Sequence, residues 1–322
     1  MRILLIRFSS LGDLVTLEPA FRAYRHFFNK AHLTLLTSGL GRGVYEDTEY
    51  FDEYITGKSF LDTLHKLRQN DYDIVINLQC TRPSHWLALF TKKARLVNQS
   101  ASMMQKYFHI KPTVKTHKDI LEELGYDRDK IETYFASNSM ISLPYFPAVF
   151  SWNNQESKIV ALAPGASERW ESKKWGDKNY LDLAGVLLSA GYKIVLIGSA
   201  LEYSIGEDIE KKYPQIINMI NKTNLSQLKA LLASVDLLVC NDSGPAHLAA
   251  AVGTDTLTIF GSTDIKHCVV FGPYFGQHKY AVMEPRLQCQ PCYKSKCPTQ
   301  HECMNNISVM QIYSLSQEIL EK

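Results

Sequence analysis

Short apolar runs alternate with amphipathic stretches along most of the chain, and each kind of pattern predicts a different element. Apolar runs predict strands at residues 3–8, 32–37, 73–77, 158–163, 192–197, 236–240 and 256–260. Stretches with a helical period predict helices at residues 14–28, 180–190, 225–233, 245–252 and 309–320. Because strands and helices alternate, we expect an α/β fold built on parallel sheets.

The alternation occurs twice, and the two series are separated at residues 142–156 by Pro144, Pro147, Asn153 and Asn154. A chain of 322 residues is about twice the usual length of one domain. We therefore predict two Rossmann-like domains, residues 1–152 and 153–308, that face a central cleft. The helix at residues 309–322 closes the fold and is free to pack back on the first domain. Ligands of such sheets bind at the carboxyl ends of the strands.

The composition narrows the class of protein. Hydrophobic residues make up 45% of the chain and the net charge is +2, which indicates a globular protein and gives no sign of nucleic-acid binding. The seven cysteines do not form a secreted disulfide framework, so we expect a reduced, cytosolic setting. Arg7 interrupts the first apolar run, which predicts a buried strand rather than a signal peptide. No uncharged apolar run reaches the roughly 20 residues that span a bilayer, so membrane contact is expected to be peripheral.

A short turn follows the first predicted strand and reads Ser9-Ser10-Leu11-Gly12-Asp13. Backbone N–H groups at such a strand-to-helix turn can face a ligand. Asp13 opens the next helix, where a carboxylate is favoured as a cap. The alternative places Asp13 at the edge of a ligand site as a general base.

Two further segments follow strands of the second half. One reads Asn241-Asp242-Ser243-Gly244-Pro245-Ala246-His247, and the free N–H groups of the helix that it starts form a seat for phosphate. A plain capped helix gives the same pattern, and a lone histidine there is typically packed. The other is the loop Pro164-Gly165-Ala166-Ser167 followed by Ser172-Lys173-Lys174-Trp175. Its lysines are either solvated or within reach of a diphosphate above the strand ends.

The order and spacing of these segments resemble glycosyltransferase family 9, the bacterial heptosyltransferases. The matching stretches are RILLIRFSSLGDLVTLEPAFRAYR, APGAS with SKKWGDKNYLDLA, NDSGPAHLAAAVGTDTLTIFGSTD and the cysteine-rich CQPCYKSKCPTQHECM. The resemblance covers nearly the whole chain. It implies a GT-B fold with an N-terminal acceptor domain and a C-terminal donor domain. It also implies ADP-heptose as the donor, the lipopolysaccharide inner core as the acceptor, and inversion at the anomeric centre.

The resemblance assigns roles to individual residues. The family's early aspartate falls on Asp13 as the general base, with Ser10 and Gly12 beside it at the acceptor. The expected donor-binding residues are Lys173 on the diphosphate, Asp242, Ser243 and Gly244 of the D-[ST]-G run, and Pro245, His247 and Ser167 near them. Lys174 and Gly176 replace the Arg and Pro common after that lysine. Asn221 or Lys222 stands where some members carry a ribose-binding acid, so Asn221 is expected to contact the nucleotide.

Two features bear on metals. The D-x-D motif Asp127-Arg128-Asp129 lies in a charged turn far from any predicted strand end. We therefore expect Lys173 and the helix N-terminus at Ser243 to stabilise the leaving diphosphate, with no metal or other cofactor required. Cysteines 289, 292, 297 and 303 have the spacing C-x2-C-x4-C-x5-C, which is compatible with a metal knuckle. A reduced, packed loop is the alternative that we favour.

Residues 74–118 contain no Asp or Glu but eight basic residues, mixed with aromatic and apolar ones. The basic residues are Arg82, Lys92, Lys93, Arg95, Lys106, Lys111, Lys115 and Lys118, and the apolar ones are Trp86, Phe90, Met103, Met104, Tyr107 and Phe108. A basic run is usually a solvated face. Because the implied acceptor is an anionic glycolipid, we expect Arg82, Lys92, Lys93 and Arg95 to bind it. This face is then expected to rest peripherally on the cytoplasmic surface of the anionic inner membrane.

Other functions are compatible with parts of the sequence. A family member of this kind can use another nucleotide-sugar or a protein acceptor. A protein of another class, a Rossmann-type nucleotide-binding protein or dehydrogenase, lacks support because no G-x-G-x-x-G follows a strand. Thermal stabilisation by ADP but not by NAD distinguishes the transferase from that class.

Overall fold

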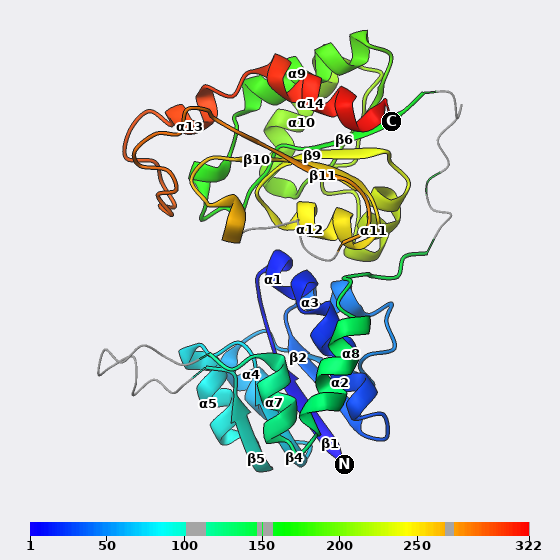
Figure 1. Ribbon diagram of the computed structural model, residues 1–322, viewed down its shortest axis with the longest axis vertical. Helices are drawn as coiled ribbons and strands as arrows, with labels where there is room; N and C mark the ends of the chain where they lie inside the picture. The colour runs from blue at the N-terminus through cyan, green and yellow to red at the C-terminus, as the bar shows by residue number, and fades with distance from the viewer. Residues whose placement is uncertain (101–113, 147–149, 151–156, 268–273, 322) are drawn as a thin grey trace. The chain divides into compact units, whose positions relative to one another are not determined.

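The computed structural model describes residues 1–100, 114–146, 150, 157–267 and 274–321. The chain forms two compact units, Met1–Leu143 and Pro144–Lys322, which we call unit 1 and unit 2 (Figure 1). The division lies inside the interruption at residues 142–156. Within that interruption, residues 147–149 and 151–156 lie outside the described residues.

Unit 1 is built on a parallel sheet with the strand order β3-β2-β1-β4-β5. Its strands are β1 (Arg2–Ile6), β2 (His32–Thr37), β3 (Glu53–Thr56), β4 (Tyr72–Asn77) and β5 (Lys93–Asn98). The central strand β1 is fully buried from Ile3 to Ile6, as its apolar sequence requires. The three strands expected in this half are confirmed, whereas the sequence does not predict β3 and β5.

Seven described helices accompany this sheet. They are α1 (Leu11–Thr16), α2 (Glu18–Phe27), α3 (Gly39–Tyr45), α4 (Phe60–Leu67), α5 (Arg82–Phe90), α7 (His117–Glu123) and α8 (Arg128–Ser137). The single helix expected at residues 14–28 is wrong, because α1 ends before Leu17 and α2 begins after it. Pro19 causes the break, since it has no N–H to donate to the carbonyl four residues earlier.

Unit 2 contains a six-stranded parallel sheet with the order β11-β10-β9-β6-β7-β8. Its strands are β6 (Ile159–Ala163), β7 (Lys193–Leu196), β8 (Ile217–Asn218), β9 (Leu237–Asn241), β10 (Asp255–Phe260) and β11 (His278–Val282). Numbered within the unit from β8, the order is the 3-2-1-4-5-6 of a Rossmann sheet. The four expected strands are confirmed, and so is an α/β fold with two Rossmann-like parallel sheets.

The helices of unit 2 flank its sheet, and the strand-end loops add three short 3-10 turns. The helices are α9 (Asp177–Ser189), α10 (Tyr203–Lys212), α11 (Leu225–Ala233), α12 (Gly244–Ala251), α13 (Glu302–Asn305) and α14 (Val309–Leu320). The turns are η1 (Glu171–Lys173), η2 (Ala200–Glu202) and η3 (Ile265–His267). The predicted helices at 180–190, 225–233, 245–252 and 309–320 are confirmed to within a few residues.

The last helix, α14, packs inside unit 2. It lies beside α9 and against strands β9, β10 and β11 (Figure 1). Its buried residues Ile312, Ile319 and Leu320 belong to the same core as Trp175 and Tyr180. The sequence allowed this helix to pack back on the first domain. In the structure its apolar residues pack into the core of unit 2.

Parallel strands place the loops that follow them at one edge of each sheet. In unit 1 the loops after β1 and β4 meet there, since the N–H groups of Phe8 and Ser9 donate to the side-chain carbonyl of Gln79 at 2.9 and 3.4 Å. In unit 2 the loops after β6 and β9 meet in the same way, because Asn241 donates to the carbonyls of Pro164 and Gly165 at 2.7 and 3.1 Å.

Candidate active-site residues

Asp13 is the third residue of α1, just beyond the carboxyl end of β1. The backbone N–H and the hydroxyl of Ser10 both donate to its Oδ2, at 2.9 and 3.1 Å. The Asp13 side chain is 57% exposed, and its Oδ1 has no hydrogen-bond partner among the described residues. Gly12 precedes it in the first turn of the helix. The carboxylate therefore caps α1 with one oxygen and leaves the other available, so both interpretations of Asp13 are compatible with the geometry.

Arg7 lies beside Asp13, although no motif in the sequence marks it as a site residue. Its Nη2 is 3.2 Å from the Oδ2 of Asp13, and its Nη1 donates to the carbonyl of Leu78 at 3.0 Å. Leu78 directly follows β4, which neighbours β1 in the sheet. The contact depends on this strand pairing, which a single sequence does not reveal.

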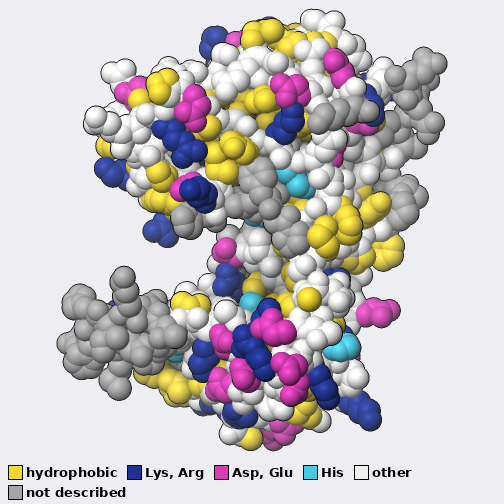
Figure 2. Space-filling model, in the orientation of Figure 1, with side chains coloured by type: hydrophobic (Ala, Val, Ile, Leu, Met, Phe, Trp, Pro, Cys, Tyr) yellow, Lys and Arg dark blue, Asp and Glu magenta, His cyan; other side chains and the backbone are white. Residues whose placement is uncertain are grey.

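The basic side chains expected at the acceptor are partly neutralised by acids from elsewhere in unit 1. The ion pairs are Lys92–Asp71 at 3.5 Å, Arg95–Glu123 at 4.0 Å, Lys115–Glu123 at 2.5 Å and Lys118–Glu132. Figure 2 shows acidic and basic side chains intermixed over α7. The ammonium of Lys93 donates to the carbonyls of Leu89 and Thr91, and Arg82 is exposed at the start of α5. Lys106 and Lys111, like Met103, Met104, Tyr107 and Phe108, lie outside the described residues.

Lys173 and Asp242 form an ion pair in unit 2. The ammonium nitrogen of Lys173 lies 2.7 Å from the Oδ2 of Asp242, and the two side chains are 17% and 6% exposed. The hydroxyl of Thr263 donates to the same oxygen at 2.6 Å. The ammonium also lies 5.2 Å from the centre of the Trp170 ring. The loops after β6, β9 and β10 therefore converge on one lysine.

The N-terminus of α12 carries Ser243, Gly244 and Pro245 as expected. Ser243 precedes the helix, but its hydroxyl donates to the carbonyl of Asn241 at 3.1 Å and makes no capping bond to the helix. N–H groups of a first turn have no partner inside their helix and can bind an anion. His247 is half-buried with its Nδ1 3.1 Å from the Tyr274 hydroxyl, which is the packed arrangement that the sequence allowed.

Glu202 is a buried carboxylate at the strand-end loops of unit 2 that the sequence does not single out. It ends η2 after β7, and its Oε2 accepts from the N–H and the hydroxyl of Ser199, both at 2.8 Å. A Cβ on Gly165 would lie 2.5 Å from its Oε1, so the carboxylate rests against the loop after β6. That loop also contains Ser167, which is exposed. The S-x-x-E spacing of a capping box is the local signal that marks Glu202.

The side chain of Asn221, which was expected to contact the nucleotide, is hydrogen-bonded within the protein. Its Nδ2 donates to the Tyr203 hydroxyl at 2.6 Å, and its N–H donates to the carbonyl of Gly198 at 2.9 Å. Its φ of 54° is the left-handed region, which asparagine tolerates better than most residues. The geometry gives Asn221 a turn-forming contact after β8.

The cysteine-rich loop before α13 packs against the loops after β6 and β10. The Ser172 hydroxyl donates to the carbonyl of Lys294 at 2.5 Å, and the Tyr293 N–H donates to the carbonyl of Ser262 at 2.8 Å. Cysteines 289, 292, 297 and 303 line one cavity of about 50 Å³. Burial, reinforced by the neighbouring thiols, raises the pKa of Cys303 to about 11. In the part of the chain that the structure describes, no three His, Cys, Asp or Glu side chains are arranged to hold a metal ion.

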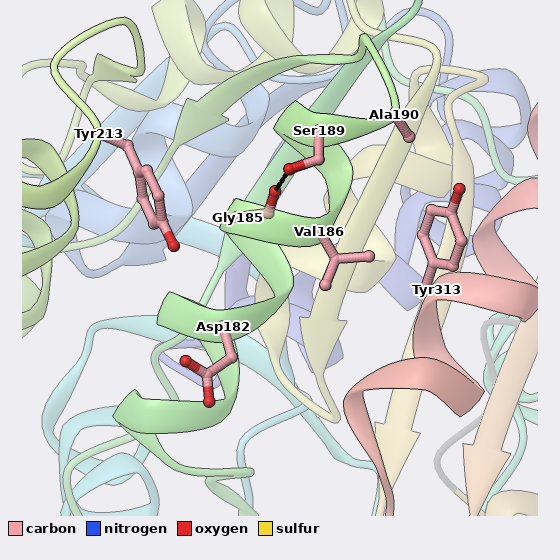
Figure 3. A pocket seen from close by; sticks show the side chains of 7 residues that line it. All are labelled: Asp182, Gly185, Val186, Ser189, Ala190, Tyr213 and Tyr313. Carbon is pink, nitrogen blue, oxygen red and sulfur yellow. Dashed lines mark hydrogen bonds between the residues drawn. The ribbon is translucent and has the colours of Figure 1, made fainter.

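Three other features lie away from the strand-end loops. The D-x-D aspartates are at the N-terminus of α8, where Asp127 accepts from the N–H of Lys130 at 3.1 Å. A surface hollow of about 600 Å³ lies over α9, between Tyr213 and Tyr313 (Figure 3). It holds none of the site residues expected from the sequence. Across the described residues, no helix has both the length and the apolar character to cross a bilayer.

Comparison with known proteins assigns the family. The model of "Glycosyltransferase family 9 (heptosyltransferase)" matches residues 61–302. The chain is 25% identical over 330 residues to lipooligosaccharide heptosyltransferase 2 of Campylobacter jejuni, covering 97% of this chain and 96% of that relative. Its fold is similar to that of E. coli ADP-heptose lps heptosyltransferase II, with a TM-score of 0.74, 20% identity and coverage of 100% and 99% of the two chains. A family 9 glycosyltransferase from Veillonella parvula gives a TM-score of 0.75 at 19% identity, covering 100% and 97%.

Proposed function

Because the chain belongs to glycosyltransferase family 9, we propose that it moves a heptose from ADP-heptose to a sugar hydroxyl of the lipopolysaccharide inner core. The observation that carries the proposal is that each unit places a suitable reactive or binding group at the carboxyl ends of its strands. A carboxylate with a free oxygen, Asp13, stands at the strand ends of unit 1. A nearly buried ammonium, Lys173, stands at the strand ends of unit 2 beside the loop that opens α12. Asp13 can serve as the base that deprotonates an acceptor, and Lys173 as the cation that binds a diphosphate.

On the donor side, Lys173 and the first turn of α12 offset the charge that develops on the departing ADP. Asp242 and Thr263 hold the lysine in place before the donor binds, so little reorganisation is needed when the diphosphate leaves. This arrangement performs the task that a divalent cation has in other transferases. The D-x-D at Asp127 supports the same conclusion, because its aspartate is used to cap α8. Turnover is then independent of added metal.

Glu202 is the residue that we assign to the ribose of the donor. It lies at the carboxyl ends of β6 and β7, the edge where Rossmann sheets bind nucleotides. Its Oε2 is held by Ser199, and a carboxylate can accept hydrogen bonds from ribose hydroxyls. Asn221 is a weaker candidate because its amide already donates to Tyr203.

On the acceptor side, Asp13 takes the proton of the attacking hydroxyl. The hydroxyl oxygen then forms a bond to the anomeric carbon while the bond from that carbon to ADP breaks. Attack from the face opposite the leaving group inverts the anomeric centre in one displacement. A carboxylate in this position contributes about 10²–10⁴ in rate.

The acceptor is a glycolipid, so we propose that unit 1 works at the cytoplasmic surface of the inner membrane. Helices α4 and α5 contact each other and together expose Phe60, Leu61, Trp86, Leu89 and Phe90. The rings of Trp86 and Phe90 are stacked with centroids 5.6 Å apart. A set of exposed aromatic and leucine side chains beside Arg82 and Lys92 suits the interface of an anionic bilayer.

The test of the base is Asp13→Asn, assayed with ADP-heptose and a core oligosaccharide. We expect turnover to fall by about 10²–10⁴-fold while ADP affinity, measured by calorimetry, is unchanged. The chain offers a matched control in Asp119→Asn, because Asp119 is also the third residue of a helix. It accepts the N–H of its own cap Thr116 at 2.8 Å and pairs with Arg128 at 2.9 Å. Equal rates for the two variants would reduce Asp13 to a helix cap.

The same assay separates the alternatives. Turnover with another nucleotide-sugar, or with a protein acceptor in place of the oligosaccharide, would keep the reaction class and change the substrate. A thermal shift with NAD but not with ADP would contradict the transferase assignment altogether.

A further inference from the structure

Arg7 is held in one orientation at the end of β1. Its side chain is 17% exposed, its backbone N–H donates to the carbonyl of Leu36 at 3.0 Å, and its Nη1 donates to the carbonyl of Leu78 at 3.0 Å. The bond to Leu78 holds the guanidinium beside the loop after β4, where its Nη2 lies 3.2 Å from the Oδ2 of Asp13.

The two oxygens of Asp13 have different surroundings. Oδ2 receives the N–H and the hydroxyl of Ser10 and lies 3.2 Å from Arg7. Oδ1 receives no hydrogen bond from the residues that the structure describes. Two hydrogen bonds and one ion pair on the same oxygen restrain the rotation of the carboxylate, so the geometry favours Oδ1 as the atom that takes a proton.

Arg7 differs from an arginine with a structural role in the same unit. Arg25 uses all of its guanidinium, since Nε donates to Tyr50, Nη1 to Ala31 and Nη2 to Asp52. The Nε of Arg7 is buried and has no hydrogen-bond partner in the described part of the chain. A buried donor left unpaired costs stability, as it does at Arg2 and Arg22, and the contact that sets Arg7 apart is the one with Asp13.

Arg7 brings a positive charge close to Asp13, with its Nη2 3.2 Å from the Oδ2 of the carboxylate. The other titratable group whose charge interacts with Arg7 is His117 of α7, whose pKa is lowered to about 4 by burial and by Arg7. This histidine is therefore neutral from about pH 5 upward and leaves Arg7 as the cation that acts on Asp13.

We propose that Arg7 is the positioning residue of the general base: it anchors Oδ2 of Asp13 and thereby presents Oδ1 to the acceptor hydroxyl. This inference rests on the proposed function, because it needs Asp13 to be the base. Arg7 does not itself touch the reacting atoms. Its effect is expected on turnover, and not on the binding of ADP.

The experiment compares Arg7→Met, Arg7→Lys and the control Arg25→Met, using ADP-heptose and a core oligosaccharide. For Arg7→Met we expect kcat to fall at least tenfold while the KM for ADP-heptose stays nearly unchanged. Arg7→Lys keeps the charge but cannot reach Leu78 and Asp13 together. We expect it to lower kcat as well. Arg25→Met is expected to change thermal stability only.

A double-mutant cycle tests whether Arg7 acts through Asp13. In the Asp13→Asn background, Arg7→Met is expected to cause no further loss of turnover. Independent, multiplying losses would overturn the proposal, as would a kcat for Arg7→Met that matches that of Arg25→Met. If Arg7→Met does not fold, a wild-type kcat in Arg7→Lys would overturn it equally. Full activity in Asp13→Asn alone would instead refute the assignment of the base.

Discussion

The Oδ2 atom of Asp242 accepts the hydroxyl of Thr263 at 2.6 Å and lies 2.7 Å from the ammonium of Lys173. The Lys173–Asp242 pair joins the loop after β6 to the loop after β9, and both side chains are largely buried. The resemblance to family 9 assigned the lysine to the diphosphate and the aspartate to the sugar. The structure adds that the aspartate holds the lysine in place, so the donor meets a cation that is already oriented.

Lys173→Ala is therefore expected to weaken ADP binding by about 10- to 150-fold, the range for losing a charged hydrogen-bond partner. Thermal stability should fall as well, because Asp242 is then left buried without its cation. Calorimetry with ADP and a melting curve measure the two effects. Lys174→Ala is the matched control, since it removes the adjacent lysine. Equal ADP affinity in both variants would contradict the role of Lys173.

Glu202→Gln is expected to weaken ADP binding by a smaller factor, about 3- to 10-fold, the loss of one modest hydrogen bond. The ligand supplies a sharper test. Wild-type protein should bind 2′-deoxy-ADP or 3′-deoxy-ADP less tightly than ADP, and Glu202→Gln should remove that preference. Asn221→Ala is expected to keep it. If Glu202→Gln still prefers ADP to the deoxy analogues and Asn221→Ala does not, the ribose contact belongs to Asn221 instead.

The strands that the sequence did not predict are the edge strands of the two sheets. Interior strands such as β1 and β9 are buried on both faces and therefore appear as continuous apolar runs. An edge strand is covered less completely and tolerates charge, as β5 does at Lys93 and Arg95. β8 has only two residues. Periodicity cannot distinguish such segments from loops.

The candidate site divides in the same way. Asp13, Ser243 and Gly244 could be predicted because their positions depend on local order, a strand followed by a turn and a helix. The partnership of Arg7 with Asp13 depends on which strands are neighbours, and so does the contact of Glu202 with Gly165. The basic run is a further example, because the acids that neutralise it come from α7, α8 and the loop before β4. The sequence shows that this segment is rich in basic residues, but it does not show that acids from other segments lie beside them and reduce the local charge.

Turnover is expected to be unchanged by EDTA and by added Mg²⁺ or Mn²⁺. The physical reason is that, in the proposed mechanism, Lys173 and the first turn of α12 supply the positive charge at the diphosphate. Initial rates before and after chelation measure this. Loss of activity with EDTA that Mg²⁺ restores would show that charge stabilisation needs a metal.

The cysteine-rich loop provides the control for that experiment. It supports the residue before Lys173 through the bond from Ser172 to Lys294, so a metal held there would affect stability rather than the reaction. We expect elemental analysis of protein purified without chelator to find no stoichiometric metal. One equivalent of zinc or iron, together with a melting temperature that falls on chelation, would assign it to the four cysteines.

The exposed apolar face of α4 and α5 makes the membrane proposal specific. Leu61 is 76% exposed, and Leu89 and Phe90 lie on the same side of α5 as Trp86, at helical spacing. Several neighbouring basic residues are paired with acids, so their electrostatic attraction is weaker than the sequence suggested. Apolar contact is then expected to contribute a large share of binding, and anionic lipid a smaller, salt-sensitive share.

Co-sedimentation with anionic and neutral liposomes separates these shares. Lys92→Glu/Lys93→Glu/Arg95→Glu is expected to weaken binding to anionic vesicles at least tenfold, since each basic residue near the surface contributes about 1 kcal/mol. Leu61→Ser/Leu89→Ser should weaken binding to both lipid types, because it removes apolar area that inserts regardless of charge. The charge-matched control is Lys158→Glu/Lys178→Glu/Lys279→Glu in unit 2, where each lysine is paired with an acid. If this control loses anionic binding as strongly as the unit 1 triple variant, the attraction reflects net charge alone and α4 and α5 are not the docking face.

Two further outcomes would contradict the contributions to binding separately. Equal binding of wild-type protein to both lipid types would contradict the electrostatic contribution. Binding unaffected by Leu61→Ser/Leu89→Ser would contradict the apolar contribution.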